Sequence, residues 1–333
     1  MIKMLMFDVK ETEMKVINDY DTSDYEITYF RESLNINTKL TVQEYDETSI
    51  ISVFITSDIS KGLIDKFKNL RVILTRSICH KHIDINECRR RNIAVINVND
   101  YARESISQYV IGVALGLSRN LFQAYCDTKQ GKFDFEKYES ENLDKLSLGV
   151  IGTGSVGSAV CELGHKLGMK IYANDIVINN NIKDFAEYVS LNDLIRKSDI
   201  ITLHIPYNKD FKHMISFKEF KIMKDGAYII NTSDCNLINP VALYRAIKDK
   251  KLNGAGLDLL LTGQKDIFGE KCEHVEYEEL ENIIVREKLL AQNNVLITPR
   301  ISYDTKECLT KIIKSNFHDL KDYFIGRKTN RVV

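Results

Sequence analysis

The chain has 333 residues, 44% hydrophobic and 28% charged, a length that suits two domains of ordinary size with a core each. Its formal net charge of −1 leaves no basic excess for phosphates, and no apolar run predicts a membrane span, so we expect no nucleic-acid partner and no membrane. Seven cysteines, without the spacing of a disulfide framework or a zinc site, favour the reduced cytoplasm and predict no metal.

The first hundred residues alternate short apolar segments with polar stretches. The opening run MIKMLMFDVKE indicates a first strand rather than a signal peptide. This alternation predicts a βα domain with a small parallel sheet over roughly residues 1 to 100. Strands are expected at Lys3–Val9, Tyr25–Tyr29, Ile50–Ile55, Leu70–Thr75 and Ile93–Val98, with polar stretches Lys61–Lys68 and Ile85–Arg91 between them.

An unusually apolar helical segment follows, from Glu104 to Leu121. Its hydrophobic residues cover well over half of the helix circumference, which predicts a helix buried between masses. We expect it to connect two domains, and it could reach a subunit interface. The polar stretch Phe122–Asp144 then predicts an exposed arm.

The stretch Leu148–Asp175 predicts a dinucleotide-binding unit, because an apolar strand is followed by the spacing G-x-G-x-x-G and then by a helical pattern. Gly152 permits the tight turn, Gly154 lets the backbone approach a pyrophosphate, and Gly157 lets the helix pack against the strand. The residues expected to contact the cofactor here are Gly152, Gly154, Ser155, Val156 and Gly157.

An acidic residue, Asp175, ends the strand that comes after this helix. An acid at this place can accept hydrogen bonds from both ribose hydroxyls of an adenosine and would repel a 2′-phosphate. The pattern therefore favours NAD over NADP as the cofactor. The alternative is an α/β domain whose turn happens to be rich in glycine.

Strands and helices continue to alternate after Asp175, and Ser216 with Glu219 forms a capping box. A charged insertion, Gly263–Leu290, has no defined pattern. The last piece, Tyr303–Val333, has helical spacing and could return to the first domain, which would make that domain discontinuous. Helices are expected at Leu191–Lys197, Phe217–Met223 and Val241–Asp249, and strands at Ile200–Ile205, Ala227–Asn231, Gly254–Leu260 and Val295–Thr298.

Several motifs in order resemble the D-isomer-specific 2-hydroxyacid dehydrogenase family over nearly the whole chain. LTRSICHKHID resembles the family's substrate loop, and Asp100–Gln108 resembles a segment that follows it. The segment after Asp258 and the ending TNRVV look most like D-lactate and D-2-hydroxyisocaproate dehydrogenases. The other matching segments are LGVIGTGSVG, ITLHIPYNKDFKHMI, MKDGAYIINTS, GAGLD and VLITPR.

This resemblance implies an α/β fold with two Rossmann-like or flavodoxin-like domains, each with a parallel sheet. A substrate domain of residues 1–102 and 301–333 would be discontinuous, with an NAD-binding domain of residues 103–300 inserted into it. The family further implies NAD as cofactor, a small-molecule ligand or substrate in a cleft, and a homodimer formed through the NAD-binding domains.

Most cofactor positions of the family carry over to this chain. For the substrate loop the resemblance implies Arg76 and Cys79, and Cys79 replaces a glycine whose backbone would meet the substrate carboxylate. His80 and His82 in the same loop are expected to be exposed. Besides the glycine stretch and Asp175, the matching cofactor residues are His204, Pro206, Asn231, Thr232 and Asp258.

The three catalytic positions depart from the family. Reducing a 2-oxo acid needs a cation for the carboxylate, a proton donor and an acid that orients the donor, and this family supplies Arg, His and Glu. Here Asp234 takes the arginine position, Arg300 the histidine position and Gly263 the glutamate position. Arg300 could bind a carboxylate instead, pairing with Asp234 when no ligand is bound.

Three functions therefore remain open. The first is an NAD-binding protein without ordinary 2-hydroxyacid dehydrogenase activity. The second is an active oxidoreductase whose pocket is rebuilt around Asp234 for an amine-bearing substrate. The third is a D-lactate-type dehydrogenase that acts through substitute residues, with the proton donated by Tyr101, Tyr303, His80 or His82.

Overall fold

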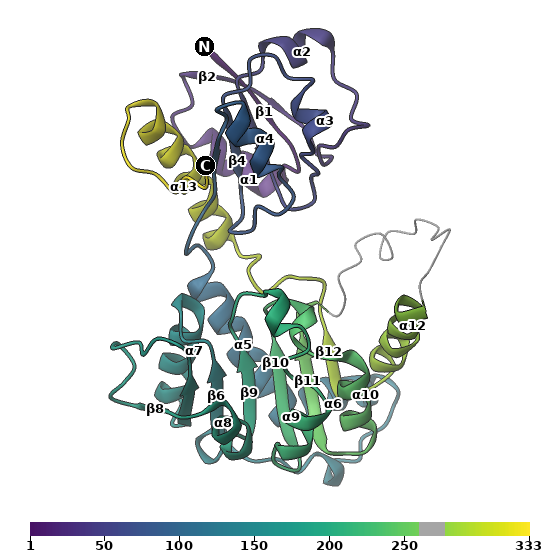
Figure 1. The fold of residues 1–333 in the computed structure, drawn as a ribbon. Coiled ribbons are helices and arrows are strands. Elements are labelled where there is room, and N and C mark those ends of the chain that lie inside the picture. Colours follow the sequence, from purple (N-terminus) through teal and green to yellow (C-terminus); the bar gives the residue numbers. More distant parts are fainter. Residues whose placement is uncertain (260–276) are drawn as a thin grey trace. The chain divides into compact units, whose positions relative to one another are not determined.

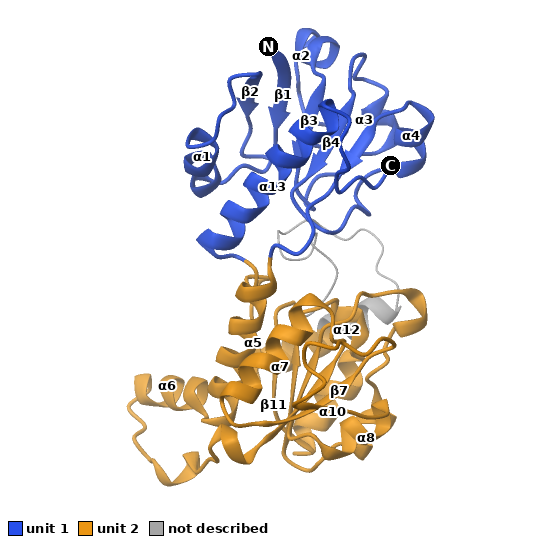
Figure 2. Ribbon diagram, turned by 90° about the vertical axis from the view of Figure 1, so that its left-hand side faces the viewer, with its two compact units in different colours: residues 1–101, 304–333 blue, residues 102–303 orange. Residues whose placement is uncertain are grey.

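A computed structural model gives the fold. It describes the backbone of residues 1–259 and 277–333, and the side chains of residues 1–259 and 284–333. The elements are drawn in Figure 1. The chain divides into two compact units, one of residues 1–101 and 304–333 and one of residues 102–303 (Figure 2). Each unit is built on a parallel sheet, which confirms the expected α/β class with two sheets.

Unit 1 (residues 1–101 and 304–333) has a five-stranded sheet in the order β2-β1-β3-β4-β5. All four strand pairs are parallel, and the five expected strands of this region are confirmed. Tyr25–Tyr29 has the expected bounds, the first strand starts one residue earlier and ends sooner than expected, and the other three are shorter. The strands are β1 Ile2–Met6, β2 Tyr25–Tyr29, β3 Ile50–Val53, β4 Val72–Thr75 and β5 Ala94–Ile96.

Helices cover both faces of this sheet because successive buried residues of each strand point to opposite faces. Leu5 and Phe7 join one core with α3 and α4, and Met4 and Met6 join the other with α1 and α13. The polar stretches of this region thus include helices. The helices are α1 Glu11–Asn18, α2 Val42–Glu47, α3 Lys61–Ile64, α4 Ile85–Arg90 and α13 Lys306–Phe324.

Unit 2 (residues 102–303) has a seven-stranded parallel sheet in the order β12-β11-β10-β9-β6-β7-β8. Strand order reverses between β6 and β9, and in such sheets the ligand crevice lies at the carboxyl ends of the strands on either side of this point. The strands are β6 Ser147–Ile151, β7 Lys170–Asn174, β8 Ala186–Tyr188, β9 Ile200–Leu203, β10 Ala227–Asn231, β11 Leu252–Leu257 and β12 Val295–Ile297.

Two hydrophobic cores flank the sheet of unit 2. Helices α5 and α7 bury their apolar residues on one face, and α8, α9, α10 and α12 bury theirs on the other. No helix of the described residues is long and apolar enough to cross a membrane. The helices are α5 Arg103–Ser118, α6 Leu121–Lys129, α7 Ser155–Lys166, α8 Leu191–Lys197, α9 Phe217–Ile222, α10 Pro240–Lys248 and α12 Tyr277–Leu290.

The helix expected at Glu104–Leu121 is buried, but its end was wrong. Asn120 adopts a left-handed conformation (φ 51°), which breaks the helix after Ser118 and starts α6. The following stretch is therefore partly helical rather than a plain exposed arm. Asp127 of α6 is 5% exposed and accepts hydrogen bonds from Tyr138 and Lys137, which fasten the rest of the arm to the helix.

Candidate functional site

The glycine turn of unit 2 is sterically fixed by two of its three glycines. Gly152 has φ 89°, and a Cβ there would stand 2.5 Å from the carbonyl oxygen of His204. A Cβ on Gly157 would stand 1.8 Å from the carbonyl oxygen of Gly152. Neither position admits a side chain, so the turn and the start of α7 pack as the spacing requires.

Gly154 differs, because a Cβ there would meet nothing within 4 Å. It is the N-cap of α7 and is exposed, as is Ser155 after it, while Val156 is half-buried. The first N–H groups of a helix have no partner within the helix and carry its positive dipole end. The open backbone at Gly154 therefore fits a pyrophosphate.

Asp175 lies directly after β7 and is hydrogen-bonded to the glycine turn. Its Oδ2 accepts from the backbone N and the hydroxyl of Thr153, at 2.5 and 3.1 Å, and its Oδ1 accepts from Val177 N at 3.2 Å. Burial raises the pKa of Asp175, but these hydrogen bonds outweigh it and hold the pKa below its ordinary value. The carboxylate is ionised at neutral pH, and Oδ1, which accepts from Val177 N, keeps a lone pair for a ribose hydroxyl.

His204 lies just beyond β9 and packs against the glycine turn. Its backbone N donates to Ile151 O at 2.7 Å, and its Nε2 lies 2.9 Å from the hydroxyl of Thr202. Burial lowers the pKa of His204 to about 3, so the ring is neutral at physiological pH. Pro206 follows in the irregular segment after β9 and is exposed.

The strand ends of β10 and β11 carry three more expected residues. Asn231 is 1% exposed and its side chain bonds to Asp234 O at 3.0 Å and to Ser233 N at 2.9 Å. The hydroxyl of Thr232 is buried and has no hydrogen-bond partner among the described residues, so it remains available to a ligand. Asp258, in contrast, is fully occupied.

Asp258 fastens the loop that carries Arg300. Its Oδ1 accepts from the Thr298 hydroxyl at 2.7 Å and from Ile301 N at 2.8 Å, and its Oδ2 accepts from Ser302 N at 2.8 Å. With 3% of its surface exposed, it connects the carboxyl ends of β11 and β12. The structure thus gives this acid a positioning role.

Asp234 and Arg300 do not form the ion pair that the sequence suggested. Asp234 is the N-cap of a 3-10 helix, Cys235–Leu237, and its Oδ1 accepts from the backbone N and the side-chain amide of Asn236, both at 2.9 Å. Arg300 is exposed and left-handed (φ 58°). The glutamate position, Gly263, lies outside the described residues.

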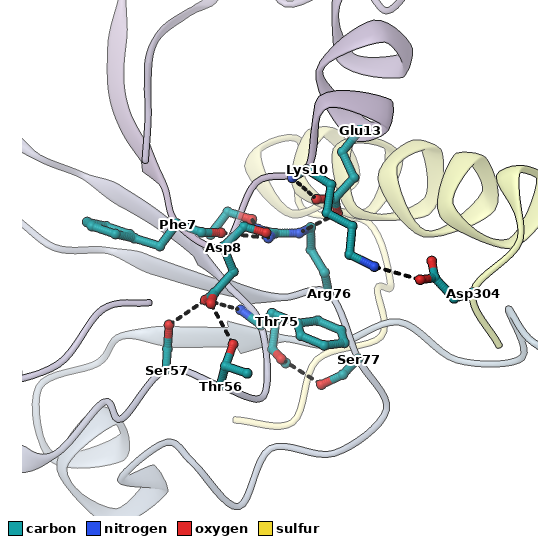
Figure 3. A network of polar contacts seen from close by, with 12 residues as sticks. Phe7, Asp8, Lys10, Glu13, Thr56, Ser57, Thr75, Arg76, Ser77 and Asp304 are labelled. Carbon is teal, nitrogen blue, oxygen red and sulfur yellow. Dashed lines mark hydrogen bonds and ion pairs between the residues drawn. The ribbon is translucent and has the colours of Figure 1, made fainter. Parts of the chain in front are cut away.

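Arg76 of unit 1 is buried in a polar network rather than presented by a loop (Figure 3). It is 1% exposed. Its guanidinium donates to Glu13 Oε1 and Ser52 Oγ at 3.0 Å each. It also donates to the backbone carbonyls of Phe7 and Asp8, at 2.6 and 3.1 Å. We therefore reassign Arg76 from the substrate loop to the core, because its donors are used within the protein.

The loop after Arg76 is held by its carbonyl groups. Ser77 Oγ donates to Cys79 O at 2.6 Å, and Asn97 Nδ2 donates to Ile78 O at 3.1 Å. Within a planar trans peptide the N–H points opposite to the C=O. The N–H groups of Cys79 and His80 therefore point away from Ser77 and Asn97, and neither has an acceptor among the described residues.

Four other expected residues lie in unit 1. Cys79 is half-buried, and Tyr101, the last residue of the first segment of unit 1, is half-buried as well. His80 and His82 were expected to be exposed, but both are partly buried and the Nδ1 atoms of both are inaccessible. No three His, Cys, Asp or Glu side chains of the described residues converge on a metal site.

Sequence reasoning missed the contacts that join distant segments. Tyr188 of β8 donates to the hydroxyl of Thr153 at 2.9 Å, and the Tyr109 hydroxyl of α5 bonds to that of Thr298. The two partners of each contact lie 35 and 189 residues apart, so no local pattern signals them.

The family model for "D-isomer specific 2-hydroxyacid dehydrogenase, NAD binding domain" matches residues 111–302. The "D-specific alpha-keto acid dehydrogenase" of Enterococcus faecium is 32% identical over 277 residues, which cover 82% of each chain. The crystal structure of an Aquifex aeolicus D-lactate dehydrogenase with NAD and lactic acid is 29% identical, with a TM-score of 0.80, and covers 97% of this chain and 96% of that one.

The structure of D-2-hydroxyisocaproate dehydrogenase also superposes, with a TM-score of 0.85, 25% identity and 99% of both chains covered. The fold and these similarities define an oxidoreductase scaffold of the NAD-dependent type. More specifically, the chain belongs to the D-isomer-specific 2-hydroxyacid dehydrogenase family, and unit 2 is its NAD-binding Rossmann domain.

Proposed function

We propose that this protein binds NAD(H) and a small carboxylate ligand but does not reduce ordinary 2-oxo acids, so that it acts as a nucleotide-responsive binding protein. One observation carries the proposal. Asp234, which the resemblance to the family places at the cation position, is an anion that also caps its own turn through Asn236.

The energetic consequence follows from the charges alone. When bound, NADH supplies the hydride of the family's reaction, and the protein must hold the acid's carboxylate and provide a proton. An anion about 4 Å from that carboxylate replaces an attraction of roughly 4 kcal/mol by a similar repulsion, with an effective dielectric near 20. Arg300 does not substitute as the donor, because a guanidinium stays protonated at any ordinary pH.

Two features still favour binding. The open backbone at Gly154 and the ionised Asp175 suit NAD and disfavour a 2′-phosphate. In unit 1, the N–H groups of Cys79 and His80 have no acceptor within residues 1–259 and 277–333, and such a pair of neighbouring donors is of the kind that receives an anion. These donors support a carboxylate ligand even without the cation.

The test is a fluorescence titration of NADH with purified protein, followed by pyruvate and 2-oxoisocaproate. We expect saturable NADH binding and no oxidation of NADH. Turnover of either acid at a useful rate would contradict the proposal, and absence of NADH binding would contradict every dehydrogenase-type function. The double variant Asp234→Arg, Arg300→His returns two family residues and is expected to raise any residual activity.

A second candidate is an oxidoreductase for amine-bearing substrates. Asp234 Oδ2 accepts no hydrogen bond from the described residues, which leaves half of the carboxylate for a substrate cation. A screen of cationic alcohols and ketones with NAD(H) tests this function. Lack of turnover would argue against this function, as would an Asp234→Asn variant that binds the cationic compounds as tightly as the native protein does. A third, D-lactate-type function would need a substitute donor such as Tyr101 or Tyr303, and the pyruvate assay tests it.

The same proposal includes a homodimer formed through unit 2, in the cytoplasm. The α6 helix and the arm beyond it expose four large apolar side chains, a pattern typical of a covered surface. They are Leu121, Tyr125, Phe133 and Phe135, from 55% to 81% exposed. Light scattering after size exclusion is expected to give twice the chain mass, and Phe135→Ser to shift the mass toward the monomer. A mass of one chain for the native protein would exclude the dimer.

A further inference from the structure

A chain of four polar groups runs through the carboxyl edge of the unit 1 sheet. His82 Nε2 lies 3.3 Å from Thr75 Oγ1, Thr75 Oγ1 lies 2.9 Å from Ser77 Oγ, and Ser77 Oγ lies 2.6 Å from Cys79 O. Thr75 and Ser77 are 0% and 3% exposed, so solvent does not compete for these hydrogen bonds. Figure 3 shows the Thr75–Ser77 contact.

The direction of every hydrogen bond in this chain is fixed by its last member. A carbonyl oxygen only accepts, so the single hydroxyl proton of Ser77 goes to Cys79 O. Ser77 then has to accept from Thr75, which uses the single proton of Thr75. Thr75 in turn accepts from His82, so the proton of His82 is on Nε2 and its Nδ1 is a bare lone pair.

The surroundings of His82 agree with this tautomer. Its Nδ1 is inaccessible and has no hydrogen-bond partner in the described part of the chain, as is also true of His80 Nδ1. Burial lowers the pKa of His82 to about 4, with a further lowering from His80, against the raising effects of Asp8 and Asp58. The ring is therefore neutral at physiological pH. A proton on Nδ1 would leave a buried donor unsatisfied. Thr75 would then donate to Nε2, and the hydroxyl oxygens of Thr75 and Ser77 would face each other without a proton between them.

We propose that His82 is a positioning residue, which holds the Ile78–His80 loop through Thr75 and Ser77 so that the N–H groups of Cys79 and His80 face an anionic ligand. Ser77 turns the Cys79 carbonyl inward, and Asn97 does the same for Ile78. Without His82 the hydroxyl of Thr75 loses its donor and can turn away from Ser77. This inference rests on the proposed carboxylate-binding function.

The tautomer is measured directly by two-dimensional NMR of the ¹⁵N-labelled imidazole rings in the full-length protein, with His82→Gln to assign the signal. We expect a protonated Nε2 and an unprotonated Nδ1 at neutral pH. A ring with its proton on Nδ1, or with both tautomers in fast exchange, would overturn the relay.

The positioning role is measured by calorimetric titration of oxamate, a small carboxylate, into the NADH complex. His82→Leu and Thr75→Val are each expected to weaken oxamate binding about tenfold, while the affinity for NADH is unchanged. His82→Gln keeps an amide N–H near the position of Nε2 and is expected to stay within about threefold of the native protein. Because both residues act in one relay, the double variant is expected to lose no more than either single variant.

The outcomes separate the two proposals. A native protein that binds neither NADH nor oxamate contradicts the proposed function. A native protein that binds both, with a His82→Leu variant equal to it, contradicts only the positioning role. Equal losses of NADH and oxamate affinity in His82→Leu would indicate general unfolding, which circular dichroism detects directly. In that case His82→Gln carries the test, and a loss of oxamate affinity in this variant as large as in His82→Leu overturns the inference.

Discussion

The substitution Gly154→Ala separates cofactor binding from folding. Gly154 has φ −62°, which alanine adopts freely, and its added Cβ would meet nothing within 4 Å. The free energy of unfolding should therefore change by less than about 1 kcal/mol, toward higher stability. The methyl group fills the space through which a pyrophosphate reaches the backbone. Loss of one N–H hydrogen bond to a charged phosphate costs about 1.5–3 kcal/mol, so the Kd for NADH should rise roughly 10- to 100-fold.

Two further alanine substitutions complete this assay, which combines urea unfolding with NADH fluorescence titration. Gly112→Ala, in α5, also adds a Cβ in open space and should stabilise the helix by about 0.5–1 kcal/mol without changing NADH affinity. Gly157→Ala places a Cβ 1.8 Å from Gly152 O and should destabilise the protein by roughly 1–3 kcal/mol or more. A Gly154→Ala variant that binds NADH with the Kd of the native protein, or that does not fold, would refute the assignment of Gly154 to cofactor binding alone.

Three other predictions concern charge. Glu13→Gln leaves Arg76 without its buried partner and should cost about 3–5 kcal/mol in urea unfolding, whereas Glu11→Gln, which removes an exposed pair, should change stability by less than about 1 kcal/mol. Because His204 keeps a pKa of about 3 when folded and about 6.5 when unfolded, stability should fall as the pH drops from about 7.5 to about 4.5, and His204→Gln should remove about 2–3 kcal/mol of that fall. Asp175→Asn should narrow the preference for NADH over NADPH in parallel titrations. A native protein that binds NADH and NADPH with equal affinity would contradict the role of Asp175.

The elements that hydrophobic pattern predicts best are the strands buried on both faces. Such strands are continuous apolar runs, and Ala227–Asn231 of β10 was predicted with the observed bounds. The helix α8, Leu191–Lys197, was also predicted with its observed bounds, because Ser190 caps its start. Strand β8 was missed because it has three residues with one exposed acid in the middle, Glu187. The end of α5 was missed because the left-handed Asn120 has no strong local signal.

The cofactor site was predictable where local sterics determine it. Gly152 and Gly157 lie within one turn, so their spacing alone specifies the geometry that is observed. The role of Arg76 was not predictable, because its acceptors come from β3, α1 and the residue just after β1, at sequence separations of 24 to 69 residues. Because Arg76 is adjacent to the motif that resembles the substrate loop, the sequence alone suggests a ligand contact, and only its burial shows that its partners are inside the protein.

The hydrogen bonds of Asp234 bear on how readily this site could change during evolution. Reintroducing an arginine would remove the acceptor for both Asn236 donors and the cap of the turn Cys235–Leu237, at a cost of about 1 kcal/mol or more. Under the proposed function, a single substitution of Asp234 toward the family residue is thus penalised before it confers any activity, and a simultaneous change of Asn236 would reduce that penalty.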